Sequence, residues 1–483
     1  MKRPSSSRKP ASGPPQTRRP ARPPVVALIS LGCAKNTVDS ERILAQLAQG
    51  GFWIAEDPAD ADLCLVNTCG FIESAREEVA ATLRAIVEAR ARGRPRVVAA
   101  IGCLVERIAE VPEFERFLSP ADARIGFGDY ARIADCCRAL LENAREDDAG
   151  RGMGARRSPL DPAFHRMPRV LTGATHSVAL KISEGCSHAC RFCSIPRIRG
   201  PQVSRPIGEI VAEAADLVRS GARELLLIGQ DTASYGYDLY GRRCLDELMR
   251  AIGADLPGDI WLRLMYAHPK HLSPAILETM ADDARWQPYL DLPLQHISTP
   301  MLRRMGRGMT GPETRKLLDT LEARTPRPII RTAFITGHPG ETEADFRELL
   351  EFVCEGRFRH VGVFAFSPEP GTAAARQSDS VPAAVAEERR AALMSAQREI
   401  SRRQLAEQIG AVVELMVDGP PRADATPPPR VRRVGRTGAQ APDVDGVTWL
   451  RGPGTGRLEP GRIIRARIVD AMDYDWIAEV AAG

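Results

Sequence analysis

The sequence predicts an α/β protein built from three parts: an amino-terminal parallel α/β domain, a partial (βα)6 barrel and a small carboxyl-terminal β-barrel. Two patterns support this expectation. Continuous apolar runs alternate with helical stretches through most of the chain, which is typical of parallel sheets covered by helices. Near the carboxyl end, short alternating strands are separated by Pro and Gly, as in small antiparallel barrels. The length of 483 residues suits about three domains of ordinary size.

The composition is that of a soluble globular protein. Hydrophobic residues make up 43% of the chain and charged residues 27%, and the net charge of +4 is too small to indicate nucleic-acid binding by the whole protein. Residues 1–24 contain seven Lys or Arg, seven Pro and no acidic residue, which predicts a disordered basic tail. No apolar run is long enough for a membrane span, and eleven cysteines without a secretory signal favour a reducing compartment. We therefore expect a cytoplasmic protein without a membrane segment.

The amino-terminal domain is expected over residues 25–142. Its buried strands and helices alternate along the chain as strand 25–30, helix 40–49, strand 62–66, helix 74–91 and strand 97–101. Each strand is followed by a cysteine: Cys33, Cys69 and Cys103. Because ligands bind just beyond the carboxyl ends of strands in open α/β sheets, we expect these cysteines to converge on one point. Three thiolates on one cubane iron-sulfur cluster leave one iron open.

The partial barrel is expected over residues 176–408, after a linker at 143–175 that is rich in Gly, Arg, Pro and Asp. Its strands are predicted near residues 178–183, 224–230, 260–265, 289–292, 329–335 and 360–366, with helices between them. Six βα units with right-handed crossovers predict an open or partial barrel. The chemistry of such a barrel belongs at the carboxyl ends of its strands.

The first barrel strand leads into the most specific motif of the chain, Glu184-Gly-Cys-Ser-His-Ala-Cys-Arg-Phe-Cys-Ser-Ile-Pro196. Its thiols, those of Cys186, Cys190 and Cys193, have the spacing Cys-x3-Cys-x2-Cys. Cubane iron-sulfur clusters normally take four thiolates, so a loop that offers three leaves one iron free to bind a small molecule. The alternative is a zinc site with His188 as the fourth ligand. The position of His188 between two closely spaced cysteines disfavours it.

Polar residues and glycines at the other strand ends predict further ligand contacts. Gln230 and Asp231 follow the second barrel strand, and Arg263 lies in the third. Gln295 follows the fourth strand and Gly337 the fifth. Glycine allows a close approach of the backbone to a ligand, and the polar side chains offer hydrogen bonds. The alternative for each position is a role in a turn or a loop cap.

The carboxyl-terminal barrel is expected over residues 409–483, after a long helix at 383–408. Strands at 412–417, 431–434 and 462–469 predict a barrel of about five strands. Its ten basic and ten acidic residues cancel, which argues against generic RNA binding and favours docking on a protein. One group of arginines is a candidate contact for phosphate: Arg430, Arg432, Arg433 and Arg436.

With both cysteine triplets placed, the chain resembles the radical S-adenosylmethionine (SAM) methylthiotransferase family from Val25 to Val480. Besides the Cys186 loop, the segments that carry the resemblance are Ser30-Leu-Gly-Cys-Ala-Lys-Asn-Thr-Val-Asp-Ser-Glu41, Val66-Asn-Thr-Cys-Gly-Phe-Ile-Glu73, Ile101-Gly-Cys-Leu104 and Phe366-Ser-Pro-Glu-Pro-Gly-Thr372. Others resemble the RimO type of that family, which acts on an aspartate of ribosomal protein S-twelve: Gln230-Asp-Thr-Ala-Ser-Tyr-Gly-Tyr-Asp-Leu-Tyr-Gly241, Tyr289-Leu-Asp-Leu-Pro-Leu-Gln-His-Ile-Ser298, Ala441-Pro-Asp-Val-Asp-Gly446 and Asp470-Ala-Met-Asp-Tyr-Asp-Trp476. Ala34 and His338 depart from the family pattern, and neither departure removes a cysteine.

The resemblance implies two [4Fe-4S] clusters and SAM as cofactors. The implied ligands are Cys33, Cys69 and Cys103 for an auxiliary cluster, and Cys186, Cys190 and Cys193 for the cluster that cleaves SAM. SAM would act both as radical source and as methyl donor, with the strand-end residues around it, and the carboxyl-terminal barrel would be of the TRAM type. The implied reaction is methylthiolation at the β-carbon of the substrate aspartate. A radical is needed because no side-chain acid or base breaks an unactivated C–H bond.

The resemblance also implies partners. The substrate is ribosomal protein S-twelve, free or on the ribosome, the electron donor is a flavodoxin or similar protein, and the enzyme acts as a monomer. One alternative is the tRNA-modifying branch of the same family, which methylthiolates an adenosine near the anticodon; the neutral carboxyl-terminal barrel and the RimO-like segments argue against it. A second alternative, a non-catalytic iron-sulfur or RNA-binding scaffold, would not cleave SAM reductively.

Overall fold

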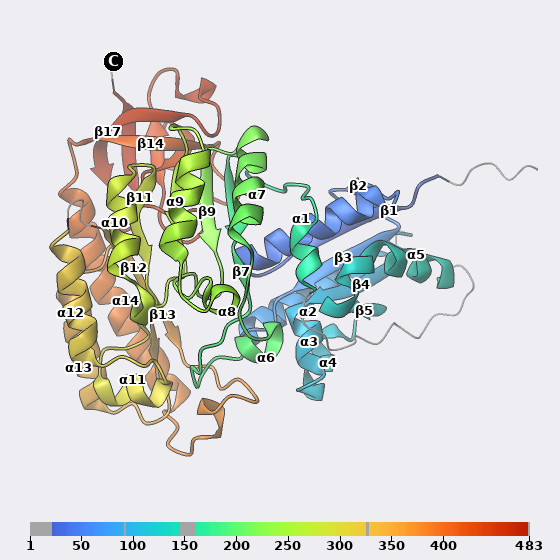
Figure 1. The fold of residues 1–483 in the computed structure, drawn as a ribbon, viewed down its shortest axis with the longest axis horizontal. Coiled ribbons are helices and arrows are strands. Elements are labelled where there is room, and N and C mark those ends of the chain that lie inside the picture. The colour runs from blue at the N-terminus through green and yellow to red at the C-terminus, as the bar shows by residue number, and fades with distance from the viewer. Residues whose placement is uncertain (1–21, 91–92, 145–160, 325–327, 482–483) are drawn as a thin grey trace, which may run out of the picture.

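The computed structural model describes residues 22–90, 93–144, 161–324 and 328–481. They form three units that follow the predicted order (Figure 1). The amino-terminal α/β unit lies on the right in this view, the six-stranded unit on the left, and the small barrel above the latter. Residues 1–21 of the predicted tail and residues 145–160 of the predicted linker lie outside the described residues. Within the described ranges, no helix combines the length and apolar character that crossing a membrane requires.

The amino-terminal unit has a parallel sheet in the order β2-β1-β3-β4-β5. Its strands are β1 (Val25–Ser30), β2 (Trp53–Ala55), β3 (Leu63–Thr68), β4 (Val97–Gly102) and β5 (Ala123–Ile125). Its helices are α1 (Ala34–Gln49), α2 (Glu73–Ala89), α3 (Cys103–Ile108), α4 (Glu115–Leu118) and α5 (Ile133–Asn143). Strands β1, β3 and β4 confirm the three predicted strands, whereas β2 and β5 are short edge strands that the apolar pattern did not indicate.

Strand β3 explains why this sheet has continuous apolar runs. Leu63 and Leu65 pack in the hydrophobic cluster that includes residues of α1 and α5. Cys64 and Val66 point to the opposite face and pack in the cluster that includes residues of α2 and α4. Successive side chains of a strand point to opposite faces, so a sheet covered by helices on both faces needs apolar residues at every position.

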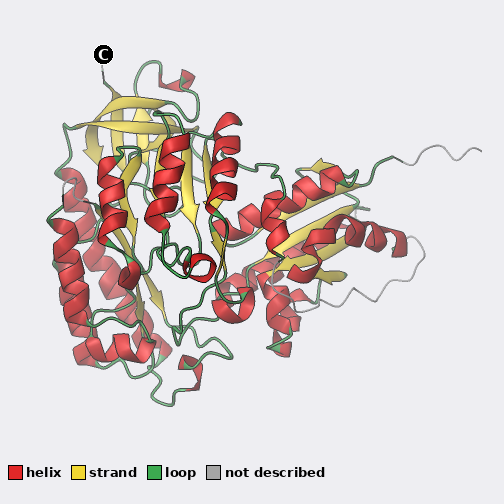
Figure 2. Ribbon diagram, viewed as in Figure 1, coloured by secondary structure: helices red, strands yellow, loops and turns green. Residues whose placement is uncertain are grey.

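The middle unit is a parallel sheet in the order β13-β12-β11-β10-β9-β6. Its strands are β6 (Ser177–Lys181), β9 (Glu224–Ile228), β10 (Trp261–Leu264), β11 (Trp286–Asp291), β12 (Ile329–Thr336) and β13 (His360–Ala365), and β7 (Ser183–Glu184) pairs with β8 (Val203–Ser204) as a hairpin. Its helices are α6 (Ile195–Arg199), α7 (Ile207–Arg219), α8 (Tyr237–Tyr240), α9 (Leu245–Asp255), α10 (Pro274–Asp282), α11 (Thr299–Met305), α12 (Gly311–Glu322), α13 (Glu343–Cys354) and α14 (Ala383–Ala406). Helices line one face of this sheet (Figure 2). The six predicted strands are all present.

The other face of this sheet is covered by the two neighbouring units. On β9, Leu225 and Leu227 pack with the helices, while Leu226 and Ile228 belong to a cluster on the opposite face. That second cluster includes Val38 of α1 and Ala441 of the carboxyl-terminal unit. The start of α1 therefore lies against the open face of the partial barrel, which brings the first cysteines of the chain to the middle unit.

The carboxyl-terminal unit is a closed barrel in the order β14-β15-β16-β18-β17. Its strands are β14 (Val412–Gly419), β15 (Val431–Arg436), β16 (Thr448–Arg451), β17 (Ile463–Ala471) and β18 (Trp476–Val480). Small and branched side chains fill its interior: Leu415, Val417, Leu450, Ala466 and Ala478. The five strands confirm the predicted size of the barrel.

Candidate cofactor site between the first two units

The first group of cysteines lies at the carboxyl ends of β1, β3 and β4. Cys33 is the residue before α1, Cys69 follows β3, and Cys103 begins α3. Gly32 has a φ of 94°, and a Cβ atom there would lie 2.9 Å from Cys69 Cβ. Only glycine combines that backbone conformation with so close an approach, so Gly32 allows the loop of Cys33 to reach the loop of Cys69.

The Asn36 side chain connects all three cysteine segments. Its Nδ2 donates to the Leu31 carbonyl (2.9 Å) and to the Thr68 carbonyl (3.2 Å), just before Cys33 and Cys69 respectively. Its Oδ1 lies 3.6 Å from Cys103 Sγ. Sequence reasoning missed Asn36, because the helix was expected to begin only at Ser40.

The thiols of this group differ in their electrostatic surroundings. Burial raises the pKa of Cys103 to about 12 and raises that of Cys69 as well. Cys33 is exposed; desolvation by the neighbouring protein acts to raise its pKa, but the positive charges of Lys35 and Arg199 and two backbone N–H groups outweigh it and lower the pKa. A thiol with a lowered pKa deprotonates readily and is the better metal ligand.

The second group, Cys186, Cys190 and Cys193, lies in the loop after β7. The loop is closed at its base by the β7–β8 hairpin and by a bond from the Cys186 N–H to the Gly200 carbonyl (3.1 Å). Arg307 Nη1 donates to Cys190 Sγ at 3.3 Å, and the Ile195 N–H donates to Cys193 Sγ at 3.5 Å. Hydrogen bonds to a cluster-bound thiolate tune the reduction potential of the cluster, so these donors suit a cluster ligand.

Burial dominates the acid–base behaviour of the second group. It raises the pKa of Cys186 to about 11 and that of Cys193 to about 12, and the neighbouring cysteines of the loop add to both shifts. This mutual effect on the pKa arises because the thiolates would repel each other, and it shows that the three sulfur atoms lie close together. A bound cation lowers these pKa values because it stabilises the thiolates.

Asp231 anchors this loop to the next strand end. Its Oδ2 lies 2.6 Å from His188 Nε2 and accepts from Ser234 Oγ (2.5 Å), while its Oδ1 accepts from the N–H groups of Ala233 (3.0 Å) and His268 (2.9 Å). Burial acts to raise the pKa of Asp231, but the bonds from His188 and Ser234 prevail and lower it to about 2. Both oxygens are engaged by protein, so Asp231 positions His188 between the first two cysteines of the loop.

His188 stacks on two further histidines. The ring centroids of His188 and His268 are 4.3 Å apart, and those of His188 and His271 are 5.1 Å apart, with planes within 27° of parallel. One ring nitrogen from each lies within 4.8 Å of the others. Lone pairs of nearly parallel stacked rings run side by side and do not meet at one point, so this arrangement is a packed platform and a poor metal site. Burial lowers the pKa of His268 to about 2 and that of His271 to about 4, so both are neutral near pH 7.

The other predicted strand-end residues, Gln230, Gln295 and Gly337, have different surroundings. Gln230 is half-buried at the end of β9, beside Asp231. Gln295 has a φ of 74°, unusual for a residue with a side chain, and its backbone bridges to Phe334 on β12. Gly337 also has a φ of 74°, and a Cβ atom there would collide with Ala386 of α14, so the close approach that glycine allows is to a helix.

Arg263 is engaged at the start of β9 and at the carboxyl-terminal barrel. Its Nε donates to Glu224 Oε1 (2.9 Å) at the start of β9, and its Nη1 donates to the Gly438 carbonyl (2.9 Å) of the carboxyl-terminal barrel. The arginine side chain is long enough to extend from the middle of β10 to the amino-terminal edge of the sheet. These contacts place the Arg263 guanidinium at the edge of the sheet opposite the cysteine loop.

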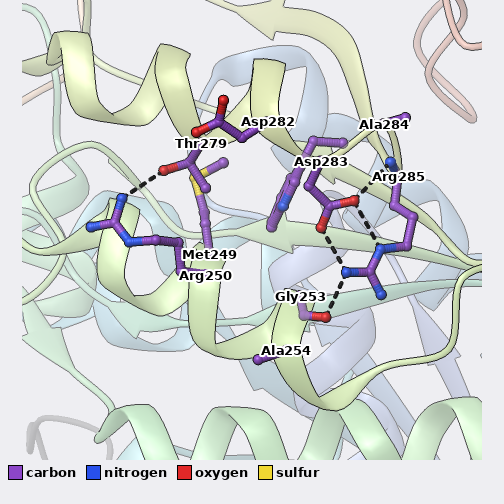
Figure 3. A pocket seen from close by; sticks show the side chains of 10 residues that line it. Met249, Arg250, Gly253, Ala254, Thr279, Asp282, Asp283, Ala284 and Arg285 are labelled. Atoms are coloured by element: carbon purple, nitrogen blue, oxygen red, sulfur yellow. Dashed lines mark hydrogen bonds and ion pairs between the residues drawn. The ribbon is translucent and has the colours of Figure 1, made fainter.

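One recess of about 500 Å³ lies on the helical side of the middle unit, between α9 and the segment from α10 to β11 (Figure 3). Arg285 is held there by Asp283 and by the Gly253 carbonyl, and Arg250 donates to Thr279. The recess is next to the start of β11, at the edge of the sheet opposite the cysteine loop, so it is separate from the candidate site.

Comparisons with known proteins agree with this organisation. The sequence profiles that match are Uncharacterized protein family UPF0004 over residues 25–117, the Radical SAM superfamily over residues 180–353, and the TRAM domain over residues 409–481. A ribosomal protein uS12 methylthiotransferase RimO of Anaeromyxobacter sp. (strain K) is 43% identical, with 95% of this chain and 93% of the relative aligned. RimO of Geobacter sulfurreducens is 39% identical over 94% of this chain and 98% of the relative.

The chain belongs to the RimO family of radical SAM methylthiotransferases. A solved structure with a similar course of the chain is the radical SAM methyltransferase TsrM from Kitasatospora setae with cobalamin and a [4Fe-4S] cluster bound, at a TM-score of 0.49 and 14% identity over 73% of this chain and 77% of that one. In this RimO-family chain, the Radical SAM superfamily profile covers the loop of Cys186, Cys190 and Cys193.

The arginine group of the carboxyl-terminal barrel is divided in this RimO-family chain. Arg436 is buried and pairs with Asp418 (2.9 Å) and with Glu224 of the middle unit (2.8 Å), so it is not available to phosphate. Arg433 donates to the Leu458 carbonyl at 2.9 Å. Arg430 and Arg432 line a surface recess together with Arg451. Of the four predicted phosphate-contacting arginines, Arg430 and Arg432 therefore remain candidates, in the surface recess beside Arg451.

Proposed function

We propose that this chain methylthiolates the β-carbon of an aspartate of ribosomal protein uS12, using two [4Fe-4S] clusters and SAM. The observation that carries the proposal is the presence of two separate cysteine triplets on adjoining units, in a chain related to RimO enzymes along 95% of its length. One triplet suffices to generate a radical from SAM. The second, on the unit before the barrel, supplies the sulfur-handling centre that a methylthio transfer needs in addition.

The donor sets fit the proposed clusters. Each triplet offers three thiols, and each has an arginine N–H within 3.3 Å of one sulfur: Arg199 at Cys103, and Arg307 at Cys190. When bound, a [4Fe-4S] cluster with one open iron binds SAM and supplies the electron that generates a carbon-centred radical from it. We assign Cys186, Cys190 and Cys193 to that cluster and Cys33, Cys69 and Cys103 to the auxiliary one.

Residues beside the loop would surround SAM. Among the described residues, the buried hydroxyls Ser183 Oγ and Ser194 Oγ have no hydrogen-bond partner. Ser183 lies next to Gly229, where a Cβ atom would approach its Oγ to 2.7 Å, and Gly229 precedes Gln230 and Asp231. Two free hydroxyls beside the cysteine loop offer hydrogen bonds to the polar groups of SAM. Gln230, Gln295 and Gly337 complete the proposed surroundings, with Asp231 acting through His188.

The residues around Cys33 would position the substrate side of the site. Lys35 Nζ lies 3.1 Å from the centroid of the Tyr266 ring. After Cys33, Asp291 is the group whose negative charge most favours the protonated form of Lys35. Burial lowers the pKa of Lys35 to about 8, so this amine is still mostly protonated near pH 7. We assign Lys35 and Tyr266 to holding the aspartate region of uS12 beside the auxiliary centre, where a cation attracts the carboxylate.

The remaining features of the proposal concern organisation and partners. We take residues 25–142, 176–408 and 409–483 as the three domains, joined by a linker at 143–175 and preceded by the basic tail at 1–24. The enzyme would act as a cytoplasmic monomer on uS12, free or within the ribosome. A flavodoxin or similar protein would supply electrons. The carboxyl-terminal barrel, of the TRAM type, would dock on protein through its charge-balanced surface.

The decisive experiment compares single cysteine variants of the anaerobically reconstituted enzyme. The wild type should hold about eight irons, and Cys103→Ala and Cys193→Ala about four each, because each removes one cubane cluster. Cys193→Ala should abolish reductive cleavage of SAM, and Cys103→Ala should retain it but produce no methylthio-aspartate. Cys354→Ala, on an exposed cysteine at the end of α13, is the control and should match the wild type.

The substrate is tested by offering uS12 and tRNA in parallel and analysing both by mass spectrometry. Methylthiolated uS12 with unmodified tRNA supports the proposal. Methylthio-adenosine in tRNA, with uS12 unchanged, would assign the chain to the tRNA-modifying branch. Normal methylthiolation by Cys103→Ala would refute the auxiliary cluster.

A further inference from the structure

Arg199 connects the two segments of the chain that carry the two cysteine groups. It is the last residue of α6, six residues after Cys193, and its side chain is 1% exposed. Its Nε donates to Cys103 Sγ at 3.3 Å, and its Nη2 donates to Asn36 Oδ1 at 2.5 Å. A side chain of the barrel unit thus donates directly to a sulfur of the amino-terminal unit.

The third nitrogen of Arg199 belongs to a closed ring of charges. Nη1 donates to Asp39 Oδ2 (3.0 Å) and to Glu184 Oε1 (2.8 Å). Lys181 Nζ pairs with the same two carboxylates. Two cations alternate with two anions, and each of the four side chains is at most 5% exposed. Because the charges cancel within the ring, it can be buried without leaving an unpaired charge.

The ring also ties both cysteine segments to one another. Asp39 lies on α1, six residues after Cys33, and Glu184 lies two residues before Cys186. Arg199 binds both carboxylates and Cys103, so moving it displaces each segment. Its guanidinium is planar with five donors in a fixed fork, and lysine cannot reproduce four simultaneous bonds in this arrangement.

We propose that Arg199 is a positioning residue that raises the reduction potential of the auxiliary cluster through its bond to Cys103; this rests on the proposed function of Cys33, Cys69 and Cys103. Reduction adds negative charge to a cluster. A buried N–H donor and a positive charge at a ligating sulfur stabilise the reduced form more than the oxidised form. Loss of that donor therefore lowers the potential.

Arg307 provides an internal comparison. Its Nη1 lies 3.3 Å from Cys190 Sγ, the same distance as Arg199 Nε from Cys103 Sγ, and its Nη2 donates to the Pro293 carbonyl. It belongs to the barrel unit and contacts a cysteine of that unit. Each arginine thus donates to one sulfur of a different cysteine group. Substituting either arginine should therefore affect the cluster held by that group.

The test uses the full chain with Cys186, Cys190 and Cys193 all changed to Ala, so that the auxiliary cluster is the one under observation. Its midpoint potential is measured by redox titration followed by electron paramagnetic resonance. In this background, Arg199→Lys keeps the charge and removes the donor fork. Arg199→Met combined with Asp39→Asn removes one cation and one anion and keeps the ring neutral. Arg197→Lys, on an arginine two residues earlier that is 43% exposed and pairs with Glu110, is the control.

The neutral pair should lower the ratio of reduced to oxidised cluster at least tenfold at a fixed potential, a shift of 59 mV for a one-electron couple. Arg199→Lys should shift the midpoint in the same direction by a smaller amount, and Arg197→Lys and Arg307→Lys should leave it unchanged. The Arg199→Met, Asp39→Asn variant is the one most at risk of losing its iron. The midpoint potential of Arg199→Lys therefore decides whether the proposal holds.

Two results separate failure of this proposal from failure of the proposed function. An iron-loaded Arg199→Lys variant with the parent midpoint would overturn the role of Arg199 and leave the cluster assignment intact. A parent protein without about four irons after removal of the second cysteine group would overturn the cluster assignment itself. A shift of equal size in Arg197→Lys would also overturn the role of Arg199, because it would show a general effect of charge on α6.

Discussion

Glu224→Gln is expected to weaken the junction between the radical SAM unit and the carboxyl-terminal barrel. Glu224 is fully buried at the start of β9. Its Oε1 accepts from Arg263 Nε (2.9 Å), and its Oε2 pairs with Arg436 Nη2 (2.8 Å) and accepts from Ser177 Oγ (2.7 Å). The glutamine has the same size but no charge, so Arg263 would be left buried beside a neutral partner.

The magnitude follows from the pKa of Glu224. Burial acts to raise it, but Arg436 and Arg263 prevail and lower it from 4.5 to about 2. At 1.36 kcal/mol for each tenfold change in affinity for the proton, the charged form contributes about 3 kcal/mol to folding. Removal of one partner from a buried ion pair typically costs about 3–5 kcal/mol, which agrees. Since the folded pKa is the depressed one, this contribution is complete above pH 4.5 and is lost as the pH falls toward 2.

The assay is urea unfolding followed by circular dichroism, on cluster-free protein so that acid release of iron does not differ between samples. At pH 7 the variant should be about 3 kcal/mol less stable than the wild type, and at pH 3 the difference should fall to roughly half. Trypsin should also release the carboxyl-terminal barrel faster from the variant. Glu247→Gln, on an exposed carboxylate paired with Arg242, is the control and should stay within about 0.5 kcal/mol. A loss below about 1 kcal/mol, or a loss independent of pH, would refute the reasoning.

Three other substitutions have separate expected outcomes. Gly102→Ala places a Cβ atom against Asn67 Oδ1 at a φ of 93°, so it should cost about four of eight irons; iron analysis with a full complement would contradict this. Asp231→Asn weakens a charge-assisted bond to His188 worth about 1.5–3 kcal/mol, so the Kd for SAM should rise about tenfold or more by calorimetry; an unchanged Kd would separate Asp231 from SAM binding. Arg263→Lys should leave that Kd within about twofold while lowering the melting temperature, because Arg263 contacts Glu224 and the carboxyl-terminal barrel; a tenfold weaker Kd would return Arg263 to the SAM site.

Strands β1, β3 and β4 and the six strands of the middle sheet were predictable because a sheet covered on both faces requires apolar residues along its strands, whereas the short edge strands β2 and β5 were not. The start of α1 was not predictable. Its helical pattern was expected from Ser40, whereas the helix begins at Ala34. Its first turns contain the polar residues Lys35, Asn36 and Asp39, and all three are buried in contact with residues of the barrel unit. Burial of a polar residue depends on partners far away in the chain, and no local pattern contains them.

The cysteines of the candidate site were predictable from spacing and from their positions after strands, and the residues that act on them were not. Arg307 reaches Cys190 over 117 positions of sequence, and Arg199 reaches Cys103 over 96. Arg263 shows the converse: its place on β10 suggested a ligand contact, and its side chain contacts Glu224 and the Gly438 carbonyl at the other edge of the sheet. Spacing identifies residues that share one ligand, whereas the supporting residues are identified by the tertiary contacts alone.

The ring of Asp39, Lys181, Glu184 and Arg199 joins the first two units through buried charges. Replacing buried ion pairs with apolar side chains of similar volume is often neutral or stabilising, by about 1–4 kcal/mol, so stability alone does not account for four buried charges. Apolar contact between domains is non-directional and tolerates small rotations. Fixed hydrogen bonds tolerate much less, because each carboxylate oxygen must meet its donor at the right angle. We infer that the ring serves to fix the relative position of the Cys33 and Cys186 segments, to which the proposed function assigns sulfur transfer and radical generation on one substrate carbon.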